Sequence, residues 1–321
     1  MLVQQELSVM QLCFANATRE EKSDNNNYSA RKDNIICFIN KAKADIISIK
    51  EMRAYLDRKT NTEVSAHQQH MNVMFETGYA STQLYACKLH NTEGNNFYNP
   101  FYYAQLFNPN NVILIKSEGF HIYKDIFGSE ESKPHSGCFI LIALYAAKKN
   151  IEEKTSPIDT TKYFFVESYH QPIAEEHKTA TAKWIHDELP NKKKHYFSDY
   201  VDIETTLTIR VGDFNTFIDN KISRDQQHSY ISDGFDHVSN EMIVLDSQDL
   251  QATDKKISHT FIPFQGDKCY NEDGSEAENS TLDYAFVKNH KTKPTTYALD
   301  NAYFNNQKIS DHVPFIVKIT I

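Results

Sequence analysis

Short apolar stretches rich in β-branched and aromatic residues recur along nearly the whole length of the 321-residue chain. Such stretches, when bounded by polar residues, predict buried β-strands. They cover residues 7–14, 45–49, 111–116, 120–123, 138–146, 163–168, 206–211, 242–245, 258–262, 282–287 and 313–319. Helical spacing of apolar residues occurs at 29–43 and from about 174 to 188, and Pro190 is expected to end the second helix. Many strands with few helices favour an α+β sandwich of two sheets with helices on the outer faces.

The polar segment 54–107 interrupts this pattern, and we interpret it as an insertion. A chain of 321 residues can form a single large layered domain, so we expect one domain covering residues 1–321. Two domains divided near 54–107 are the less favoured arrangement. His67 and His70 in this segment have a spacing that would place both rings on one helical face, but a solvated helix or loop explains them better than a metal pair.

The chain is acidic, with 34 Lys and Arg residues against 43 Asp and Glu residues and a formal net charge of −9. A negative net charge does not indicate binding to bulk nucleic acid, although an acidic protein can still have a local basic cleft. Five scattered cysteines without C-x-x-C spacing predict free thiols in a reducing compartment. We find no signal-peptide pattern and no apolar run long enough to span a membrane, so the cytoplasm is the default expectation. Export by a specialised secretion system stays open, and a monomer is expected.

Polar residues stand at the ends of the predicted strands, where a scaffold can hold them and loops leave room for a substrate. These residues are Glu51, His170, Asp213, Asn215, Asp283, Asp311 and His312. Hydrolysis of a phosphate ester needs such groups, because carboxylates hold a hard cation and a carboxylate or imidazole activates water. A single strand-end acid is more often a turn residue. Asp283 is the most unusual, since an acid within an apolar strand costs free energy unless it is paired, and His312 would supply the partner.

Five segments together resemble one family, the endonuclease/exonuclease/phosphatase superfamily with the deoxyribonuclease I-like fold. The segments are ADIISIKEMR (44–53), FVESYHQP (165–172), IRVGDFNTF (209–217), STLDYAFV (280–287) and SDHVPF (310–315). Each alone is weak, but together they follow the order of the family across almost the whole chain. The resemblance implies a four-layered α/β/β/α sandwich of two packed mixed sheets flanked by helices. It also implies an active site at one end of the two sheets.

The resemblance implies a metal site that uses Mg²⁺, with Mn²⁺ as a substitute. Glu51 matches the Mg²⁺ ligand of the family, and Asp311 matches a carboxylate close to the metal. The first strand of the family usually ends in an Asn near the metal, in a pattern like V-M-T-x-N. In this chain Cys13 falls at that position and Asn16 follows three residues later. Either Asn16 reaches the metal or the Asn is missing, and a thiol is a poor ligand for Mg²⁺.

The resemblance also implies catalytic roles for five residues. His170 matches the histidine that contacts the scissile phosphate and protonates the leaving group. Asp213 matches the residue that orients or deprotonates water, and Asn215 matches the donor that holds the water and the phosphate. Asp283 matches the acid that orients the last histidine. His312 matches the histidine that acts as a general base or binds the transition state.

Three functions follow from these residues, and the sequence does not choose the substrate. The first is a metal-dependent phosphodiesterase or phosphatase acting on a small molecule or a phospholipid head group by in-line attack of water. The second is a Mg²⁺-dependent nuclease on DNA or RNA, for which the basic run 192–195 is the only obvious cluster. The third is a binding module on an impaired enzyme scaffold, which Cys13 suggests and the full set of acids and histidines disfavours.

Overall fold

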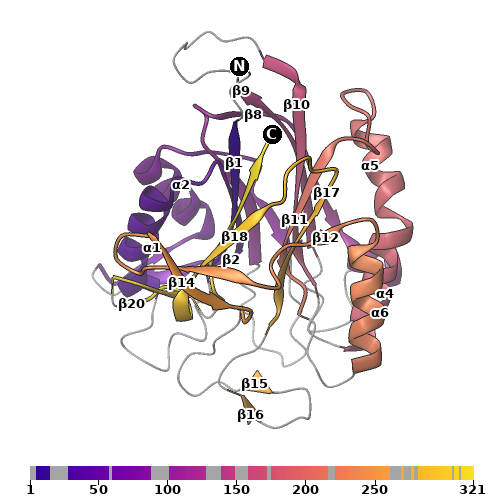
Figure 1. Cartoon of the computed structure of the whole chain (residues 1–321). Helices are drawn as coiled ribbons and strands as arrows, with labels where there is room; N and C mark the ends of the chain where they lie inside the picture. The colour runs from indigo at the N-terminus through magenta and orange to yellow at the C-terminus, as the bar shows by residue number, and fades with distance from the viewer. Residues whose placement is uncertain are drawn as a thin grey trace.

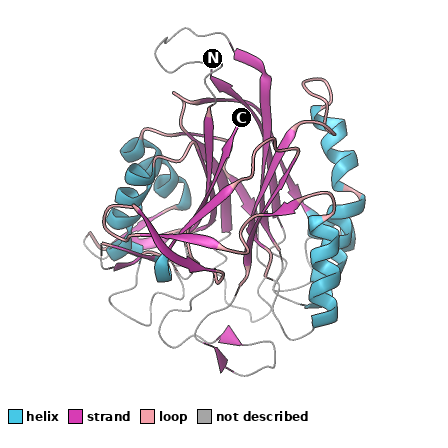
Figure 2. Ribbon diagram, viewed as in Figure 1, coloured by secondary structure: helices cyan, strands magenta, loops and turns pink. Residues whose placement is uncertain are grey.

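The computed structural model describes residues 5–14, 28–57, 60–87, 101–127, 139–148, 158–171, 175–215, 221–260, 269–270, 276–277, 281–305, 307–310 and 312–321. Two mixed β-sheets lie face to face in the middle of the molecule (Figure 1). Helices cover the outer face of each sheet, as Figure 2 shows. The expected four-layered α/β/β/α sandwich is therefore confirmed. None of the described helices is long and apolar enough to cross a membrane.

The first sheet contains nine strands within the described residues. Eight of them follow one another in space as β14 (Ala252–Ile257), β13 (Met242–Leu245), β18 (Thr295–Leu299), β21 (Phe315–Thr320), β1 (Glu6–Cys13), β2 (Ile46–Met52), β7 (Phe101–Phe107) and β5 (Ala80–Ser81). The ninth strand, β6 (Tyr85–Cys87), also pairs with β7. Strands β1 and β2 are parallel, whereas β21 and β7 run antiparallel to them on either side.

The second sheet is made of six described strands. Their spatial order is β12 (Asp236–His237), β17 (Asp283–Lys288), β11 (Leu207–Asp213), β10 (Ile158–His170), β9 (Phe139–Lys148) and β8 (Val112–His121). Strands β10 and β11 are parallel, and the other neighbours are antiparallel. Three further strand pairs lie outside both sheets, namely β3 (Tyr55–Asp57) with β4 (Thr62–Val64), β15 (Cys269–Tyr270) with β16 (Glu276–Ala277), and β19 (Tyr303–Phe304) with β20 (Gln307–Lys308).

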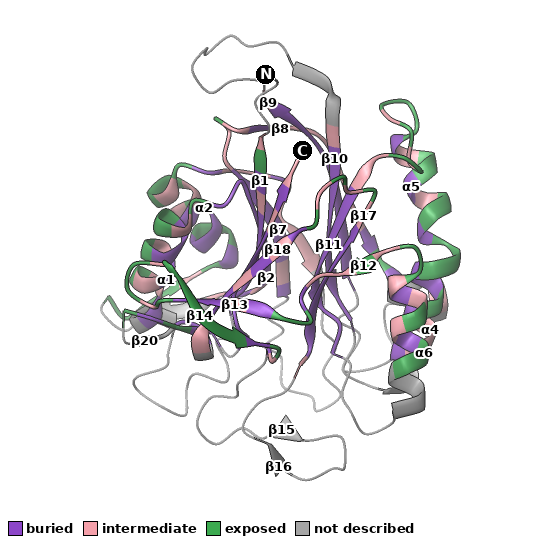
Figure 3. Cartoon of the chain, in the orientation of Figure 1, coloured by how far each residue is buried: buried purple, intermediate pink, exposed green. Residues whose placement is uncertain are grey.

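The layers are held together by four apolar clusters of described residues, the smallest of which joins β7 to β9. The central one fills the space between the sheets, where Val9 and Ile46 of the first sheet meet Phe164 and Val211 of the second. Helices α1 (Tyr28–Ala42) and α2 (Ala66–Thr77) pack on the outer face of the first sheet. Helices α3 (Ile122–Phe127), α4 (Glu175–Asp187), α5 (Leu189–Phe197) and α6 (Lys221–Ser232) cover the second sheet. The strands in the middle of both sheets are mostly buried, whereas β14 at the edge of the first sheet is largely exposed and the helices expose one side (Figure 3). This pattern follows from the apolar composition of the strands.

Several local expectations were wrong. The stretches 111–116 and 120–123 form one strand, β8, which ends at His121 and is followed by α3. Residues 258–260 lie beyond the end of β14, and 261–262 lie outside the described residues. By contrast, helix α4 ends at Asp187, as expected from Pro190, and Pro190 lies in the first turn of a further helix, α5, where its missing N–H costs nothing. Helix α6 and strand β18 had no counterpart in the predicted elements.

The segment 54–107 contains more regular structure than its polar composition suggested. Helix α2 begins at a capping Ser65 and ends at Gly78 in the left-handed conformation. His67 is solvent-exposed as expected, but His70 is buried and contacts the Ser81 hydroxyl at 2.8 Å. The end of the segment is strand β7, which pairs with β2 in the middle of the first sheet. The number of domains stays a prediction.

The parallel strands β10 and β11 approach each other closely beside their carboxyl ends. Tyr169 pairs with Gly212, and the next pair is His170 with Asp213. A Cβ atom at Gly212 would lie 2.7 Å from the backbone nitrogen and from the Cβ atom of Tyr169. Since backbone cannot rotate away as a side chain can, glycine is the residue that lets Asp213 reach its place.

We therefore expect Gly212→Ala to lower the free energy of unfolding by about 1–3 kcal/mol through overpacking. Chemical denaturation monitored by circular dichroism measures this. Gly119→Ala in β8 of the same sheet is the matched control, because its methyl group would meet the rings of Tyr85 and Phe139 instead of backbone. Equal losses in the two variants would contradict the role given to the close strand approach.

Candidate active site

The candidate site lies where the ends of both sheets meet. From the second sheet come His170 at the end of β10, Asp213 at the end of β11 and Asp283 at the start of β17. The register aligns these three residues, since His170 pairs with Asp213 and Asp213 pairs with Asp283. From the first sheet come Glu51 of β2 and His312, just before β21. The structure thus brings together five of the residues predicted from sequence.

Asp283 is the fully buried anchor of this cluster. Its Oδ2 atom lies 2.6 Å from Nδ1 of His312, which is the contact expected from the sequence. Its Oδ1 atom accepts hydrogen bonds from the ammonium of Lys50 and the amide of Gln11, both from the first sheet. Burial opposes ionisation, but His312 and Lys50 outweigh it and lower the pKa of Asp283. The carboxylate is therefore charged and ties the two sheets together.

The two histidines of the site have opposite electrostatic surroundings. Burial lowers the pKa of His170 to about 4, with only partial compensation from Glu51. Burial also disfavours the charged form of His312, but the carboxylates of Asp283 and Asp213 outweigh it and raise its pKa to about 9. In the metal-free protein at neutral pH, His170 is accordingly neutral and His312 is charged.

His170 is held from one side by aromatic residues of β7. The hydroxyl of Tyr103 lies 2.7 Å from Nδ1, and the ring of Phe101 lies 5.9 Å away, centroid to centroid. The Nε2 atom faces the carboxylates, 3.6 Å from Glu51 and 3.8 Å from Asp213. This orientation points the second ring nitrogen into the centre of the site.

Asp213 occupies the middle of the cluster. Its Oδ2 atom lies 3.8 Å from Nε2 of His170, 3.7 Å from Nε2 of His312 and 3.7 Å from Nζ of Lys50. Burial raises the pKa of Asp213 against the opposing effect of Lys50 and His312. Asn215 adopts a left-handed backbone with φ of 46°, donates its N–H to Asp213 at 2.9 Å and donates its side-chain amide to the carbonyl of Gln171 at 2.8 Å. The predicted role of Asn215 toward water and phosphate stays a prediction.

A bulge in β2 directs two neighbouring side chains into the site. The register with β7 shifts between Ile49 and Met52, and Glu51 has a φ of 59°. In a regular strand Lys50 and Glu51 would point to opposite faces. Here Lys50 reaches Asp283 and Asp213, while Glu51 reaches His170. Backbone of this kind costs about 1–3 kcal/mol and clusters at functional sites.

Sequence reasoning missed Lys50, Gln11 and Tyr103. Lys50 and Gln11 are buried polar residues inside the apolar runs IISIKEM and SVMQLC, and that interruption was a usable signal, because burying such groups costs free energy without partners. Asn16 and Asp311, both proposed as metal ligands, lie outside the described residues. Their predicted roles therefore stay predictions.

The donor atoms of the site suit a divalent cation. Three groups of side chains place one potential ligand atom each within 4.8 Å of one another: Cys13 with Glu51 and His312, Glu51 with His170 and Asp213, and Asp213 with Asp283 and His312. Carboxylate and imidazole ligands are common to many metal sites. Glu51, Asp213 and His312 each belong to two of these groups. Mg²⁺ prefers oxygen ligands, so it would select neither the thiol of Cys13 nor the imidazole nitrogens.

A sandwich of two mixed sheets with acids and histidines gathered at one end defines the deoxyribonuclease I-like class of fold. Solved structures with this fold match the chain over nearly its full length. They include an endonuclease/exonuclease/phosphatase from Bacteroides vulgatus, with 13% identity, a TM-score of 0.57 and coverage of 98% of each chain. The mannosyl-6-phosphatase of Bacteroides thetaiotaomicron has 14% identity and a TM-score of 0.56, with 97% of this chain and 98% of that chain covered.

The human Nocturnin catalytic domain, solved with a bound sulfate anion, is similar at 14% identity and a TM-score of 0.57, with 99% of this chain and 98% of that chain covered. The chain thus has the fold of endonuclease/exonuclease/phosphatase family proteins, in agreement with the resemblance seen in its sequence. No protein-family model matches the sequence. No curated protein matches it either.

The opposite charge states of the two histidines can be measured in metal-free protein. We expect ring-proton NMR titrations to give a pKa near 9 for His312 and near 4 for His170. The folded pKa of His312 exceeds its ordinary value of 6.5, so its charged form stabilises the fold fully below about pH 6.5. That contribution is lost as the pH rises through 9. Asp283→Asn should lower the pKa of His312 and remove this pH dependence from urea unfolding, whereas an unchanged His312 titration in this variant would contradict the assignment.

Lys50 is expected to be essential to the stability of the site. Lys50→Met leaves the buried carboxylates of Asp213 and Asp283 with only His312 as a shared cation among the described residues, and breaking a buried ion pair typically costs about 3–5 kcal/mol. The free energy of unfolding measures this loss. Lys183→Met is the control, because its ion pair with Asp187 is exposed and contributes little. A Lys50→Met protein as stable as the Lys183→Met protein would show that Lys50 is not the counter-charge.

Proposed function

We propose that the chain hydrolyses phosphate esters with the help of a bound divalent cation. The observation that carries the proposal is the convergence of Glu51, His170, Asp213, Asp283 and His312, from five segments of two sheets, on one buried cluster. Buried acids and imidazoles of shifted pKa are typical of catalytic sites. The same fold occurs in a protein named as a mannosyl-6-phosphatase, which supports the choice of ester.

In this proposal Asp213 orients the attacking water and accepts its proton. The carboxylate lies within 4 Å of the ring nitrogens of His170 and His312, so a water molecule bound between these groups would have a base beside it. Burial strengthens Asp213 as a base, while the ammonium of Lys50 keeps a charge of opposite sign beside it. The backbone N–H of Asn215 donates to Oδ1 of Asp213 and helps to orient this carboxylate.

His170 serves in this proposal as the donor to the phosphoryl group and its leaving oxygen. Its Nδ1 atom is engaged by Tyr103, so Nε2 is the atom that faces the reaction. A pKa of about 4 makes His170 a neutral hydrogen-bond donor, which fits stabilisation of developing negative charge. Asp283 fixes the ring of His312, so that its Nε2 faces the centre of the cluster.

The cation would be held by Glu51, with Asp311 as the second carboxylate that the sequence suggests. A bound divalent ion neutralises charge on the phosphoryl oxygens and lowers the pKa of coordinated water. The resemblance to the family implies Mg²⁺, with Mn²⁺ as a substitute, and both are included in the test below.

A small or lipid-linked phosphate ester is the proposed substrate class, ahead of nucleic acid. The basic run 192–195, which would support a nuclease, lies on α5, on the outer face of the second sheet. Lys193 in this run is buried against Glu167 at 2.9 Å, and Lys192 pairs with Asp125 at 3.4 Å. These side chains are therefore committed to the fold and do not form a basic groove beside the site.

Purified protein should hydrolyse bis-p-nitrophenyl phosphate or at least one member of a panel of sugar phosphates, phosphoinositides, sphingomyelin and short nucleic acids. Mg²⁺, Mn²⁺ and Zn²⁺ are tested in turn, and EDTA should abolish the activity. Asp213→Ala and His312→Ala should each lower kcat by about 10²- to 10⁴-fold, the usual contribution of a positioned acid or base. His186→Ala on exposed α4, paired with Asp187 and Asp233, is the matched control and should leave activity unchanged.

The proposal fails if Asp213→Ala retains full activity toward the ester that the wild-type protein cleaves. Complete inertness of the wild-type protein on the whole panel with all three ions would instead favour a binding module on the same scaffold.

A further inference from the structure

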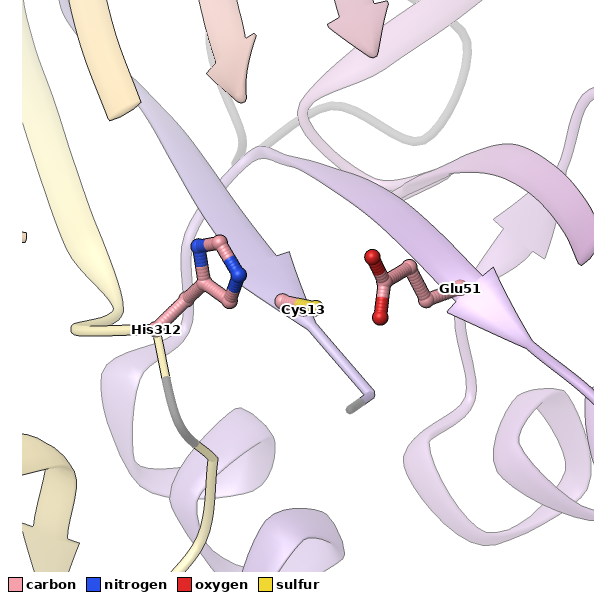
Figure 4. A group of neighbouring side chains, drawn as sticks. All are labelled: Cys13, Glu51 and His312. Carbon is pink, nitrogen blue, oxygen red and sulfur yellow. The ribbon is translucent and has the colours of Figure 1, made fainter. Parts of the chain in front are cut away.

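Cys13 lies inside the candidate site, at the end of β1. Figure 4 shows its side chain between the imidazole of His312 and the carboxylate of Glu51. The three potential ligand atoms, Sγ, Nε2 or Nδ1, and a carboxylate oxygen, lie within 4.8 Å of one another. Cys13 is fully buried and pairs in register with Lys50 of β2. The sulfur is therefore held by the sheet and is not a surface thiol.

The donor set of this group differs from what Mg²⁺ requires. Mg²⁺ takes oxygen ligands in octahedral geometry, whereas sulfur, imidazole nitrogen and carboxylate oxygen together are typical of Zn²⁺. Three protein ligands with one open position are also the usual arrangement of catalytic zinc. The chemistry of Cys13, Glu51 and His312 therefore favours a thiophilic cation.

The spacing of the donor atoms is close to what such an ion needs. Ligands at 2.0–2.3 Å in a tetrahedron lie about 3.3–3.8 Å from one another. The donor atoms of Cys13, Glu51 and His312 lie within 4.8 Å. Closing this difference takes an inward shift of at most about 1.5 Å.

The charges of the cluster lead to the same conclusion. Lys50 contacts Asp213 and Asp283, and its charge partly neutralises those two carboxylates. Within the described part of the chain, Glu51 has an ionic contact only with His170, at 3.6 Å. The Glu51 carboxylate and a Cys13 thiolate carry two negative charges, which match one divalent cation.

The orientation of His312 fits a ligand as well. Its Nδ1 atom is bound to the buried carboxylate of Asp283, so Nε2 is the nitrogen left to face the site. A carboxylate behind a ligating histidine fixes the ring and strengthens it as a donor. The pair Asp283 and His312 has this arrangement.

We propose that Cys13, Glu51 and His312 form a binding site for a thiophilic divalent cation, Zn²⁺, in place of the Mg²⁺ that the family resemblance implies. The proposal rests on the proposed function, for which it names the metal. It assigns His312 to the cation, leaves the phosphoryl oxygens to His170 and keeps Asp213 as the base. On binding, the Cys13 thiol and the protonated Nε2 of His312 each give up a proton to solvent, and a sulfur–metal and a nitrogen–metal bond form.

The test uses the full-length protein, stripped of metal and titrated with Co²⁺ as a spectroscopic substitute for Zn²⁺. We expect a thiolate-to-cobalt charge-transfer band in the near ultraviolet that Zn²⁺ abolishes by displacement. Cys13→Ser should lose the band, while Cys37→Ser, which removes an exposed thiol, should keep it. Zn²⁺ affinity measured against a chromophoric chelator should fall in Cys13→Ser by at least the roughly 10- to 100-fold that loss of an outer-shell partner costs.

Two further variants keep the test decisive if Cys13→Ser folds poorly. Glu51→Gln, at a half-buried position, should weaken Zn²⁺ binding while the sulfur band remains. Cys13→Asn restores an oxygen donor and should shift the preference of the site from Zn²⁺ toward Mg²⁺. Circular dichroism and thermal unfolding verify that each variant is folded.

The outcomes separate this inference from the proposed function. Absence of the cobalt band in wild-type protein, or a band that survives Cys13→Ser, overturns the zinc site even if Mg²⁺-dependent ester hydrolysis is found. A band that depends on Cys13, in a protein that cleaves no ester, supports the site and overturns the function.

Discussion

The buried carboxylate of Asp283 is the interaction on which the site and the meeting of the two sheets depend. It belongs to β17 of the second sheet, yet all three of its side-chain partners, Gln11, Lys50 and His312, come from the first sheet or its connection. A carboxylate moved out of water loses several kcal/mol of solvation, and it persists only where donors replace the water. Three donors from the opposite sheet therefore hold the ends of the two sheets in a fixed relation. The apolar core between them is non-directional and could not do so.

Burial and neighbouring charges together give the two histidines different pKa values. Both rings are almost fully buried, and burial disfavours the charged form of each. The distance to a carboxylate decides the difference, because Nδ1 of His312 lies 2.6 Å from Asp283. The nearest carboxylate to His170 is that of Glu51 at 3.6 Å, and its Nδ1 is engaged by Tyr103. Titratable groups whose surroundings separate their pKa values are how one site provides both a neutral donor and a charged group at the same pH.

Much of this arrangement could be predicted from sequence, because the site residues stand at the ends of the apolar runs that predict strands. The runs before His170 and Asp213 end together since β10 and β11 are parallel neighbours, and the apolar run around Asp283 gave a reason to pair it with His312. Helix α6 escaped prediction because KISRDQQHSYIS is polar on most of its surface. Packing against α4 decides its conformation, and propensity does not.

Lys50 escaped prediction for a different reason. Alternation along a strand assigns Lys50 and Glu51 to opposite faces, and only the bulge between Ile49 and Met52 reverses that. A bulge depends on the register between a strand and its partner. The residue pattern of one strand alone carries no information about that register. The first strand was expected over residues 7–14, and Cys13 lies at the end of the observed strand, Glu6–Cys13. Whether its sulfur faced the site or the core depended on pairing with β2, which likewise cannot be derived from β1 alone.

In the metal site proposed above, the bulge would also explain why the identity of the cation depends on few residues. The bulge places the ammonium of Lys50, which is covalently attached to the chain, directly beside the carboxylate of Glu51, which can bind a metal cation. Because the tethered ammonium already compensates Asp213 and Asp283, these acids keep their charges and positions whichever ion is present. The choice of ion then falls to the donors outside that network, of which Cys13 and Glu51 carry the charge. A change at position 13 can therefore alter which metal binds while leaving intact the Asp283 anchor that joins the sheets.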